Sequence, residues 1–272
     1  MSLDGRVALV TGAGGGIGRG IALCLAEAGA DVVVNSFHEE TASKVAGEIA
    51  ELGRQSLGIA ADVTSQDGVD RVVKETLDSF SKIDILVNNF GAHTQAFYDG
   101  TSPRFAKQDI NEWDEDYEFN LKSMAMMCMA VVPHLQAQKS GKIVNITSIA
   151  GIMPIPSQMT YGAAKAGAIY FTRTLAADLG RDGINVNCIS PGGVFTGMSL
   201  GAMEKAIAAN PDAKGMTPHE YWQKFVVPNM PTPLRQELTT EDIGHATVFL
   251  ASDKARSITG QNLNVDCGMV MY

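Results

Sequence analysis

The chain has 272 residues, of which 45% are hydrophobic and 19% are charged, and its formal net charge is -9. A single hydrophobic core can reach this size, so one domain spanning residues 1–272 is predicted. An acidic surface repels phosphate backbones and anionic lipid heads, which argues against nucleic acid and membrane partners. It does not exclude a bound nucleotide, because backbone amides at a helix N-terminus bind phosphate locally.

The cysteines and the N-terminus bear on the compartment. The four cysteines are scattered without CxxC spacing, which favours reduced thiols and a cytoplasmic location over a disulfide framework. The five histidines are also scattered, so no metal site is predicted. The first residues lack the pattern of a signal peptide, and the most apolar stretch, 124–132, is too short to span a bilayer.

Short β-branched runs alternate with longer helical patterns along the chain. The predicted strands are residues 7–10, 32–34, 56–60, 83–87, 142–146, 185–189 and 262–265. The predicted helices are residues 17–29, 39–52, 65–80, 109–138, 157–180 and 240–251. Several strands are apolar on both faces, as in a sheet covered on both sides. This α/β alternation predicts a doubly wound parallel sheet with helices on both faces.

Two long connections interrupt this alternation, residues 92–110 and 191–235. Each follows the carboxyl end of a predicted strand, where open α/β sheets bind ligands. Long loops in a compact domain are usually lids or binding loops. A substrate lid is therefore predicted at about residues 194–235.

The first predicted strand runs directly into a glycine-rich turn that opens a helix. Glycines let the backbone turn sharply and approach a pyrophosphate, and the helix N-terminus offers free amides and a positive dipole end. The turn lacks the Lys-Ser/Thr ending of a nucleotide-hydrolysing loop, which disfavours ATP or GTP hydrolysis. The predicted dinucleotide-binding residues of the turn are Gly12, Gly14, Gly15, Gly16, Ile17 and Gly18.

The end of the second strand bears on the choice between NAD and NADP. An acidic residue there would hold the ribose hydroxyls, and a basic one would hold a 2′-phosphate. The chain has neither, since it reads Asn35-Ser36-Phe37-His38. Ser36 has two open interpretations: a donor to the phosphate, or a capping box with Glu39 that starts the next helix. The missing carboxylate favours NADP slightly.

Tyr161 and Lys165 stand four residues apart in a predicted helix and therefore on one face. Free tyrosine titrates near pH ~10, and a nearby ammonium lowers that pKa, so the pair forms a plausible general acid/base. By itself, the pair is more often an ordinary helix surface. Ser148 ends the fifth strand and can hold a substrate oxygen. Asn120, inside an apolar helix, can satisfy a backbone kink or hold a water.

In this order, the motifs resemble those of the short-chain dehydrogenase/reductase family over essentially the whole chain. The resembling elements are Thr11–Gly18 (TGxxxGIG), Asp62-Val63, Asn88-Asn89-Phe90-Gly91 (NNAG), the tetrad Asn120, Ser148, Tyr161 and Lys165, and Pro191-Gly192 with Thr196 (PGxxxT). The resemblance implies a single-domain Rossmann-like fold and hydride transfer between a carbonyl or alcohol and NAD or NADP.

The resemblance also implies roles for individual residues. Tyr161 would exchange the proton, Lys165 would lower its pKa and bind the nicotinamide ribose, and Ser148 would polarise the carbonyl. Asn120 would hold a water that links Lys165 to solvent. The backbone of Val194 would fix the nicotinamide amide. The remaining cofactor residues that it implies are Asp62, Val63, Asn89, Gly91, Pro191, Gly192 and Thr196.

The chain departs from the family pattern at Phe90, which replaces a small alanine and is expected to change packing beside the cofactor. Met and aromatic residues in the lid suit an apolar substrate, although any single one can simply pack the loop onto the body. No pair of arginines is placed to grip a carboxylate or phosphate, which favours a neutral ketone or secondary alcohol. The predicted substrate residues are His93, Met153, Met159, Phe195, Met198 and Trp222.

Other classes remain as alternatives. A catalytically silent nucleotide-binding regulator on the same fold would usually lack the Tyr or the Lys, and a methyltransferase would need neither. Enoyl reduction is disfavoured because its usual Tyr–Lys spacing is longer. The apolar helices at 111–138 and 157–180 resemble the family's subunit interface, so a homotetramer or homodimer is expected.

Overall fold

The computed structural model describes residues 1–94, 97 and 104–271. Within these residues, seven parallel strands form one sheet in the order β3-β2-β1-β4-β5-β6-β7. The strands are β1 (Val7–Val10), β2 (Asp31–Ser36), β3 (Ser56–Ala60), β4 (Ile85–Asn88), β5 (Gly141–Ile146), β6 (Ile184–Pro191) and β7 (Asn262–Val265). The predicted fold class, a doubly wound parallel sheet, is confirmed.

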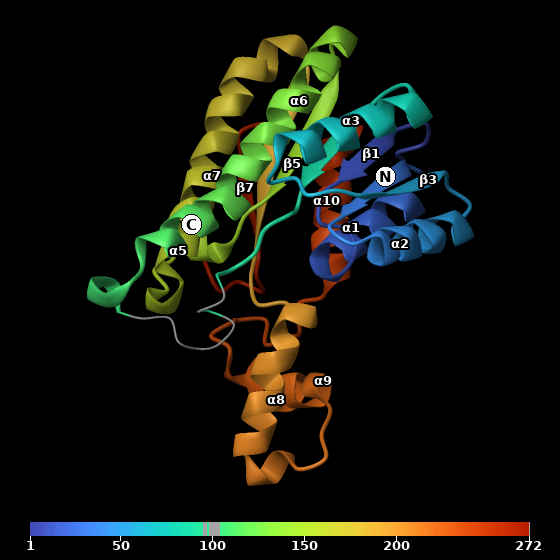
Figure 1. The fold of residues 1–272 in the computed structure, drawn as a ribbon. Helices are drawn as coiled ribbons and strands as arrows, with labels where there is room; N and C mark the ends of the chain where they lie inside the picture. The colour runs from blue at the N-terminus through green and yellow to red at the C-terminus, as the bar shows by residue number, and fades with distance from the viewer. Residues whose placement is uncertain (95–96, 98–103, 272) are drawn as a thin grey trace.

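Helices cover both faces of this sheet, as Figure 1 shows. The helices are α1 (Gly16–Glu27), α2 (Glu39–Glu51), α3 (Gln66–Phe80), α5 (Ile110–Tyr117), α6 (Ser123–Gln138), α7 (Met159–Leu179), α8 (Leu200–Ala209), α9 (Pro218–Tyr221) and α10 (Thr240–Ala251). Side chains of α1, α2 and α10 join one hydrophobic cluster, and those of α3, α6 and α7 join another. The all-apolar strands therefore lie between two cores.

The strand order places the site. It reverses at β1, whose neighbours are β2 on one side and β4 on the other. Open α/β sheets bind ligands in the crevice outside the carboxyl ends of the strands at this switch point. The turn after β1 and the segments after β4, β5 and β6 start at that edge.

The predicted helix over 109–138 is divided. Residues 110–117 form α5, Glu118–Lys122 form one turn of π-helix, and α6 then runs from Ser123 to Gln138. A π-turn inserts a residue into the helical ladder and often occurs at functional sites. The periodicity alone did not predict this interruption.

Between β6 and α10, the chain leaves the sheet. Figure 1 shows α8 and α9 standing apart from the sheet at the bottom of the view. The chain returns at Leu238, which pairs with Val194 in an isolated parallel bridge. This excursion coincides with the predicted lid.

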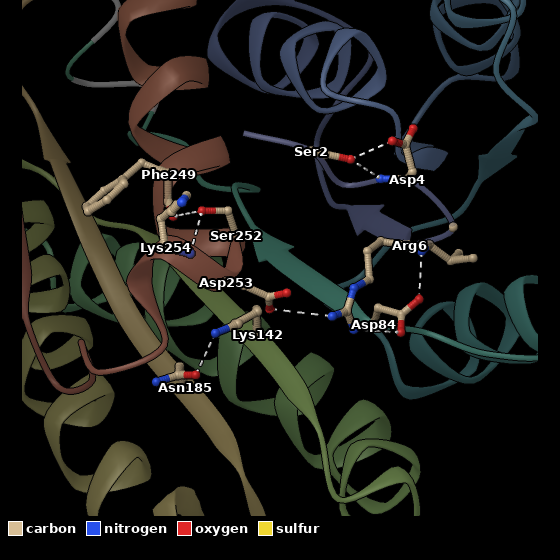
Figure 2. A network of polar contacts seen from close by, with 12 residues as sticks. Ser2, Asp4, Arg6, Asp84, Lys142, Asn185, Phe249, Ser252, Asp253 and Lys254 are labelled. Carbon is tan, nitrogen blue, oxygen red and sulfur yellow. Dashed lines mark hydrogen bonds and ion pairs between the residues drawn. The ribbon is translucent and has the colours of Figure 1, made fainter.

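The amino ends of the strands are braced by polar contacts, drawn in Figure 2. The Arg6 guanidinium lies 3.5 Å from carboxylate oxygens of both Asp84 and Asp253. The backbone N–H of Val7 donates to Asp84 at 2.8 Å. Lys142 donates to Asn185 at 2.7 Å across the next pair of strands. This edge is opposite the carboxyl ends, so these charges stabilise the sheet away from the site.

Among the described residues, no helix combines the length and apolar character needed to cross a membrane.

Candidate active site

Tyr161 and Lys165 lie in the first two turns of α7, as their spacing predicts. Lys165 is 3% exposed, and its ammonium donates to the carbonyl of Ile146 at the end of β5, at 3.1 Å. The Lys165 Nζ lies 5.4 Å from the centroid of the Tyr161 ring. The cation therefore sits beneath the ring, in contact with the carboxyl edge of the sheet.

Ser148 is brought against the same helix by close packing of small residues. It caps the 3₁₀ turn Ile149–Gly151, and its hydroxyl accepts from the N–H of Ala150 at 3.1 Å. A Cβ on Gly151 would come within 2.8 Å of the Lys165 backbone, and one on Gly162 within 2.7 Å of the Ala150 carbonyl. Only glycines permit this approach, which sets the Ser148 turn directly on the Tyr161 end of α7.

Asn120 is fully buried in the π-turn between α5 and α6. Its side-chain amide donates to the carbonyls of Ala92 at 2.8 Å and Asp116 at 3.0 Å, so the interpretation as a residue that satisfies a helix irregularity holds. Its Oδ1 is buried without a hydrogen-bond partner in the described protein. A buried acceptor of this kind normally binds a water or a ligand group.

Gly91 lies beside this unpartnered oxygen. A Cβ on Gly91 would stand 2.7 Å from Asn120 Oδ1 and 3.0 Å from Lys165 Nζ. Asn120 Oδ1 and Lys165 Nζ therefore both lie close to Gly91, with a buried acceptor near a cationic donor. A water bound between the two groups would match the role expected for Asn120.

Burial controls the protonation of the site. Desolvation lowers the pKa of Lys165 from 10.5 to about 8, while the charge of Asp116 acts in the opposite direction. Burial, and secondarily the charge of Lys165, lower the pKa of His93 to about 4. The His93 ring lies 3.9 Å from that of Tyr161, centroid to centroid. His93 is therefore a neutral imidazole against the tyrosine near pH 7.

The glycine-rich turn leads from β1 into α1. Gly12 and Gly16 have φ of 61° and 53°, in the left-handed region that glycine adopts without strain. The N-cap of α1 is Gly15, with no side-chain cap, so the first amides of the helix are not satisfied by a capping side chain. No described atom lies within 4 Å of where a Cβ on Gly15 would stand. This open helix N-terminus fits the pyrophosphate of a dinucleotide.

The amide of Asn89 holds the turn in shape. It donates to the carbonyls of Thr11 and Gly12, both at 3.0 Å. A Cβ on Gly18 would come within 2.4 Å of this amide, so α1 can pack here only with glycine. Asn89 was predicted as a cofactor residue, and its contacts within the protein make it a support of the glycine-rich turn.

Comparison with known proteins identifies the family. A family model described as enoyl-(acyl carrier protein) reductase matches residues 12–270. A 3-oxoacyl-[acyl-carrier-protein] reductase of Synechocystis is 38% identical over 273 residues, which cover 100% of this chain and 99% of that protein. The chain belongs to the short-chain dehydrogenase/reductase family.

Two solved structures of such dehydrogenases are similar over the full chain. L-sorbose reductase from Gluconobacter frateurii, complexed with NADPH and L-sorbose, has a TM-score of 0.90 at 28% identity and covers 100% of this chain and 99% of its own. A 7α-hydroxysteroid dehydrogenase complexed with NADH has a TM-score of 0.82 at 31% identity, covering 100% and 96%. This short-chain dehydrogenase/reductase is thus an oxidoreductase acting on CH–OH groups with NAD or NADP.

At the end of β2, where the adenosine end of the cofactor is expected to bind, the structure corrects one prediction. The capping box of Ser36 with Glu39 is wrong: Ser36 lies within β2, and α2 begins after His38 with no side-chain cap. The Ser36 hydroxyl instead lies 2.8 Å from that of Thr41. Because the strand continues two residues further than the pattern indicated, Ser36 is too far back to cap the helix.

The remaining predicted cofactor residues follow β3 and β6. The Asp62 carboxylate accepts from the backbone N–H of Thr64 at 2.9 Å, and Val63 is buried in the core. Pro191 ends β6, and the N–H of Gly192 donates to the Val265 carbonyl at 3.0 Å.

The segment after β6 then passes the glycine-rich turn. Val194 pairs with Leu238 in the isolated bridge, which fixes the start of the excursion. A Cβ on Gly16 would meet the Thr196 side chain at 3.5 Å. The chain after β6 therefore lies against the turn, and Thr196 is close to the open N-terminus of α1.

The predicted substrate residues divide into three groups. His93 lies on the Tyr161 ring, as expected. Phe195 and Trp222 pack on one another within the excursion, with centroids 5.9 Å apart, and Trp222 is buried. Met153 and Met159 lie half-buried between Ser148 and the start of α7. The Met198 side chain falls outside the described part of the chain.

Two further residues were not predicted as site residues. Asn35 supports the turn, since its carbonyl accepts from Ala13 at 2.7 Å. The Asp116 carboxylate accepts from Thr160, the residue before Tyr161, at 2.5 Å. Asp116 stands among other acidic residues of α5, so no pattern in the sequence distinguishes it. Phe90, expected to change packing beside the cofactor, packs its ring edge-on to Phe119 at 6.3 Å against the second core.

Proposed function

We propose that this dehydrogenase/reductase interconverts a secondary alcohol and a ketone, with Tyr161 as the general acid/base. The observation that carries the proposal is the buried ammonium of Lys165, held 5.4 Å from the centroid of the Tyr161 ring by the carbonyl of Ile146. A positive charge in a low-dielectric site stabilises the phenolate and lowers the pKa of the tyrosine toward neutrality.

The site residues divide the proton chemistry between them. Bound NAD(P)H would supply the hydride, or NAD(P)+ would accept it. Tyr161 gives its proton to the substrate oxygen during reduction and removes it during oxidation. Ser148 donates to the same oxygen and favours its negative charge in the transition state. Asn120 Oδ1, buried without a described partner, holds a water through which Lys165 exchanges protons with solvent.

The substrate is proposed to be mainly apolar and uncharged. The excursion after β6 presents Phe195 and Trp222, and His93 beside Tyr161 is neutral near pH 7. The relatives named as 3-oxoacyl-[acyl-carrier-protein] reductases act, by their names, on the 3-oxo group of an acyl chain bound to a carrier protein. Carbonyl rather than enoyl reduction is supported by these names and by the four-residue Tyr161–Lys165 spacing.

Cofactor preference and assembly belong to the same proposal. The missing carboxylate at the end of β2 and the hydroxyl pair of Ser36 and Thr41 favour the 2′-phosphate of NADP. Glu39 and Glu40 in the first turn of α2 oppose it, so titrations with both dinucleotides decide the preference.

Assembly into a homotetramer or homodimer is supported by large side chains left exposed on α6 and α7, such as Met129 and Tyr170. A single monomeric species in light scattering would contradict this expectation. A cytoplasmic location agrees with the free, buried thiols of all four cysteines.

One experiment tests the reaction. Nicotinamide absorbance is followed with NAD(H) and NADP(H) separately, against simple ketones, secondary alcohols, a 3-oxoacyl thioester and an enoyl thioester. Turnover of carbonyl or alcohol substrates, and loss of roughly 10²–10⁴-fold in kcat for Tyr161→Phe with cofactor binding retained, would support the proposal. Cofactor binding without any turnover, or an active Tyr161→Phe variant, would refute it.

A further inference from the structure

Asp116 is the one buried residue of α5, a helix that the structure describes in full. The helix carries four acidic residues, Glu112, Asp114, Glu115 and Asp116, yet only Asp116 faces inward, with 2% of its surface exposed. Burying a carboxylate is costly unless its oxygens are bonded and its charge is compensated. The position therefore calls for a physical reason beyond filling space.

The contacts of Asp116 lead to the proton-transfer residues. Its Oδ2 accepts from the Thr160 hydroxyl at 2.5 Å, and Thr160 immediately precedes Tyr161 on α7. Its Oδ1 receives a long contact of 3.4 Å from the side-chain amide of Asn120. The backbone carbonyl of Asp116 accepts from the same amide at 3.0 Å. One residue of α5 thus touches Asn120 directly and Tyr161 through its neighbour.

Among the described residues, the titratable groups around Lys165 come from three elements. Asp116 on α5 is its acidic neighbour and opposes the loss of its proton. His93, after β4, is neutral near pH 7. Tyr161 on α7 carries no charge while its hydroxyl is protonated. Burial raises the pKa of Asp116, and the Lys165 charge lowers it in return.

Two other acidic side chains of α5 also act on Asp116. Glu115 and Glu112 both act to raise its pKa. Glu115 is exposed to solvent and Glu112 only partly buried, so water screens their effect on the interior. Asp116 is therefore the acidic side chain of α5 whose charge acts most strongly on Lys165.

We propose that Asp116 is a positioning residue of the proton-transfer site: its carboxylate fixes Thr160, and with it the turn that carries Tyr161, and its charge keeps Lys165 protonated. The inference rests on the proposed function of Tyr161. A protonated Lys165 stabilises the Tyr161 phenolate, so loss of the Asp116 charge makes the tyrosine harder to ionise. The competing explanation is that Asp116 only joins α5 to α7 through its hydrogen bond to Thr160, with no electrostatic effect on Lys165.

Two substitutions separate the charge from the hydrogen bond. Asp116→Asn keeps the shape and an acceptor for Thr160 but removes the charge. Thr160→Val removes the hydrogen bond and leaves an ionisable carboxyl, whose pKa rises because Thr160 no longer stabilises its charge. Asp114→Asn, at an exposed position of the same helix, is the matched control. The measurement is the pH dependence of kcat/KM for oxidation of a secondary alcohol, with thermal unfolding recorded for every variant.

We expect Asp116→Asn to move the rising limb of this profile to higher pH by about one unit, which corresponds to a roughly tenfold loss below the limb. Thr160→Val should lower kcat and move the limb less than Asp116→Asn does, and Asp114→Asn should change neither. If Asp116→Asn does not fold, Asp116→Ser provides a second uncharged variant for the same measurement.

An unshifted limb in a folded, uncharged variant would overturn the inference and leave Asp116 a structural tie. Failure of the proposed function looks different: the wild-type protein would then show no turnover, or a limb that persists in Tyr161→Phe. The two failures are distinguishable because the Asp116 variants test the inference, whereas the wild type and Tyr161→Phe test the proposed function.

Discussion

Replacing Lys165 by methionine should make the protein more stable near neutral pH while it abolishes activity. Burial lowers the pKa of this lysine from 10.5 to about 8. At about 1.4 kcal/mol per pKa unit, keeping the ammonium charged in the folded protein costs about 3 kcal/mol. Methionine has a similar length and carries no charge, so this cost disappears in the variant.

One loss offsets part of the gain. The hydrogen bond from Lys165 to the Ile146 carbonyl is removed, which costs about 1 kcal/mol. The attraction between Lys165 and Asp116 is already contained in the lowered pKa of the lysine, so it adds no separate cost. The net expectation is a gain of about 2 kcal/mol at pH 7, or a rise in Tm of roughly 4–8 °C for a protein of this size.

The difference in stability between Lys165→Met and the wild type should depend on pH. Below pH 8, the lysine is charged in both states and the full cost is present. Between about pH 8 and 10.5, the folded protein has released this proton while the unfolded chain retains it, so the wild type gains stability relative to Lys165→Met as the pH rises. The advantage of the variant should therefore shrink between pH 7 and pH 10.

Urea unfolding of both proteins at pH 7 and pH 10 provides the assay. Lys44→Met, at an exposed position of α2, is the control and should change the free energy of unfolding by less than about 0.5 kcal/mol. A less stable Lys165→Met protein at pH 7, or a difference that is the same at both pH values, would refute the burial argument.

Three further outcomes are expected. Gly91→Ala places a methyl group 2.7 Å from Asn120 Oδ1 and 3.0 Å from Lys165 Nζ, so these two groups must shift and kcat should fall at least about tenfold. An unchanged kcat would contradict this close packing. In Gly14→Ala, the new methyl group would come within 2.4 Å of Ser36 Oγ. This clash should lower the free energy of unfolding by about 1–3 kcal/mol and weaken dinucleotide binding. Wild-type values for both measurements would contradict the packing. Because burial lowers the pKa of His93 to about 4, His93→Gln should leave the kinetic pKa values between pH 5.5 and 9 in place, and the loss of one of them would show that His93 titrates in that range.

The fold was largely predictable from local patterns. All seven strands appear where β-branched runs were found, because a strand buried on both faces must be apolar throughout. The boundaries of β2 were less certain: the strand extends to Ser36, which removed the capping box with Glu39. Strand ends depend on pairing with a neighbouring strand, here β3, and this pairing is not visible in the residues of β2 alone.

The interruption of the long helix at Asn120 was only partly foreseen. A buried amide in an apolar helix suggested a kink, but the π-turn also depends on acceptors from Ala92 and Asp116, on different segments. The buried carboxylate of Asp116 has the same character. Its hydrogen bond to Thr160 joins residues 44 positions apart in sequence, so no local pattern specifies it.

The sequence by itself determined the class of the protein, because the glycine turn, Ser148, Tyr161 and Lys165 are marked by residue type and spacing. Tertiary structure decided the electrostatics of the site. Lys165 carries a lowered pKa because it is buried beneath Tyr161 on the carbonyl of Ile146 and faces Asp116 from another helix. Burial and charge separation depend on which elements pack together, and only the folded chain brings those groups within range of each other.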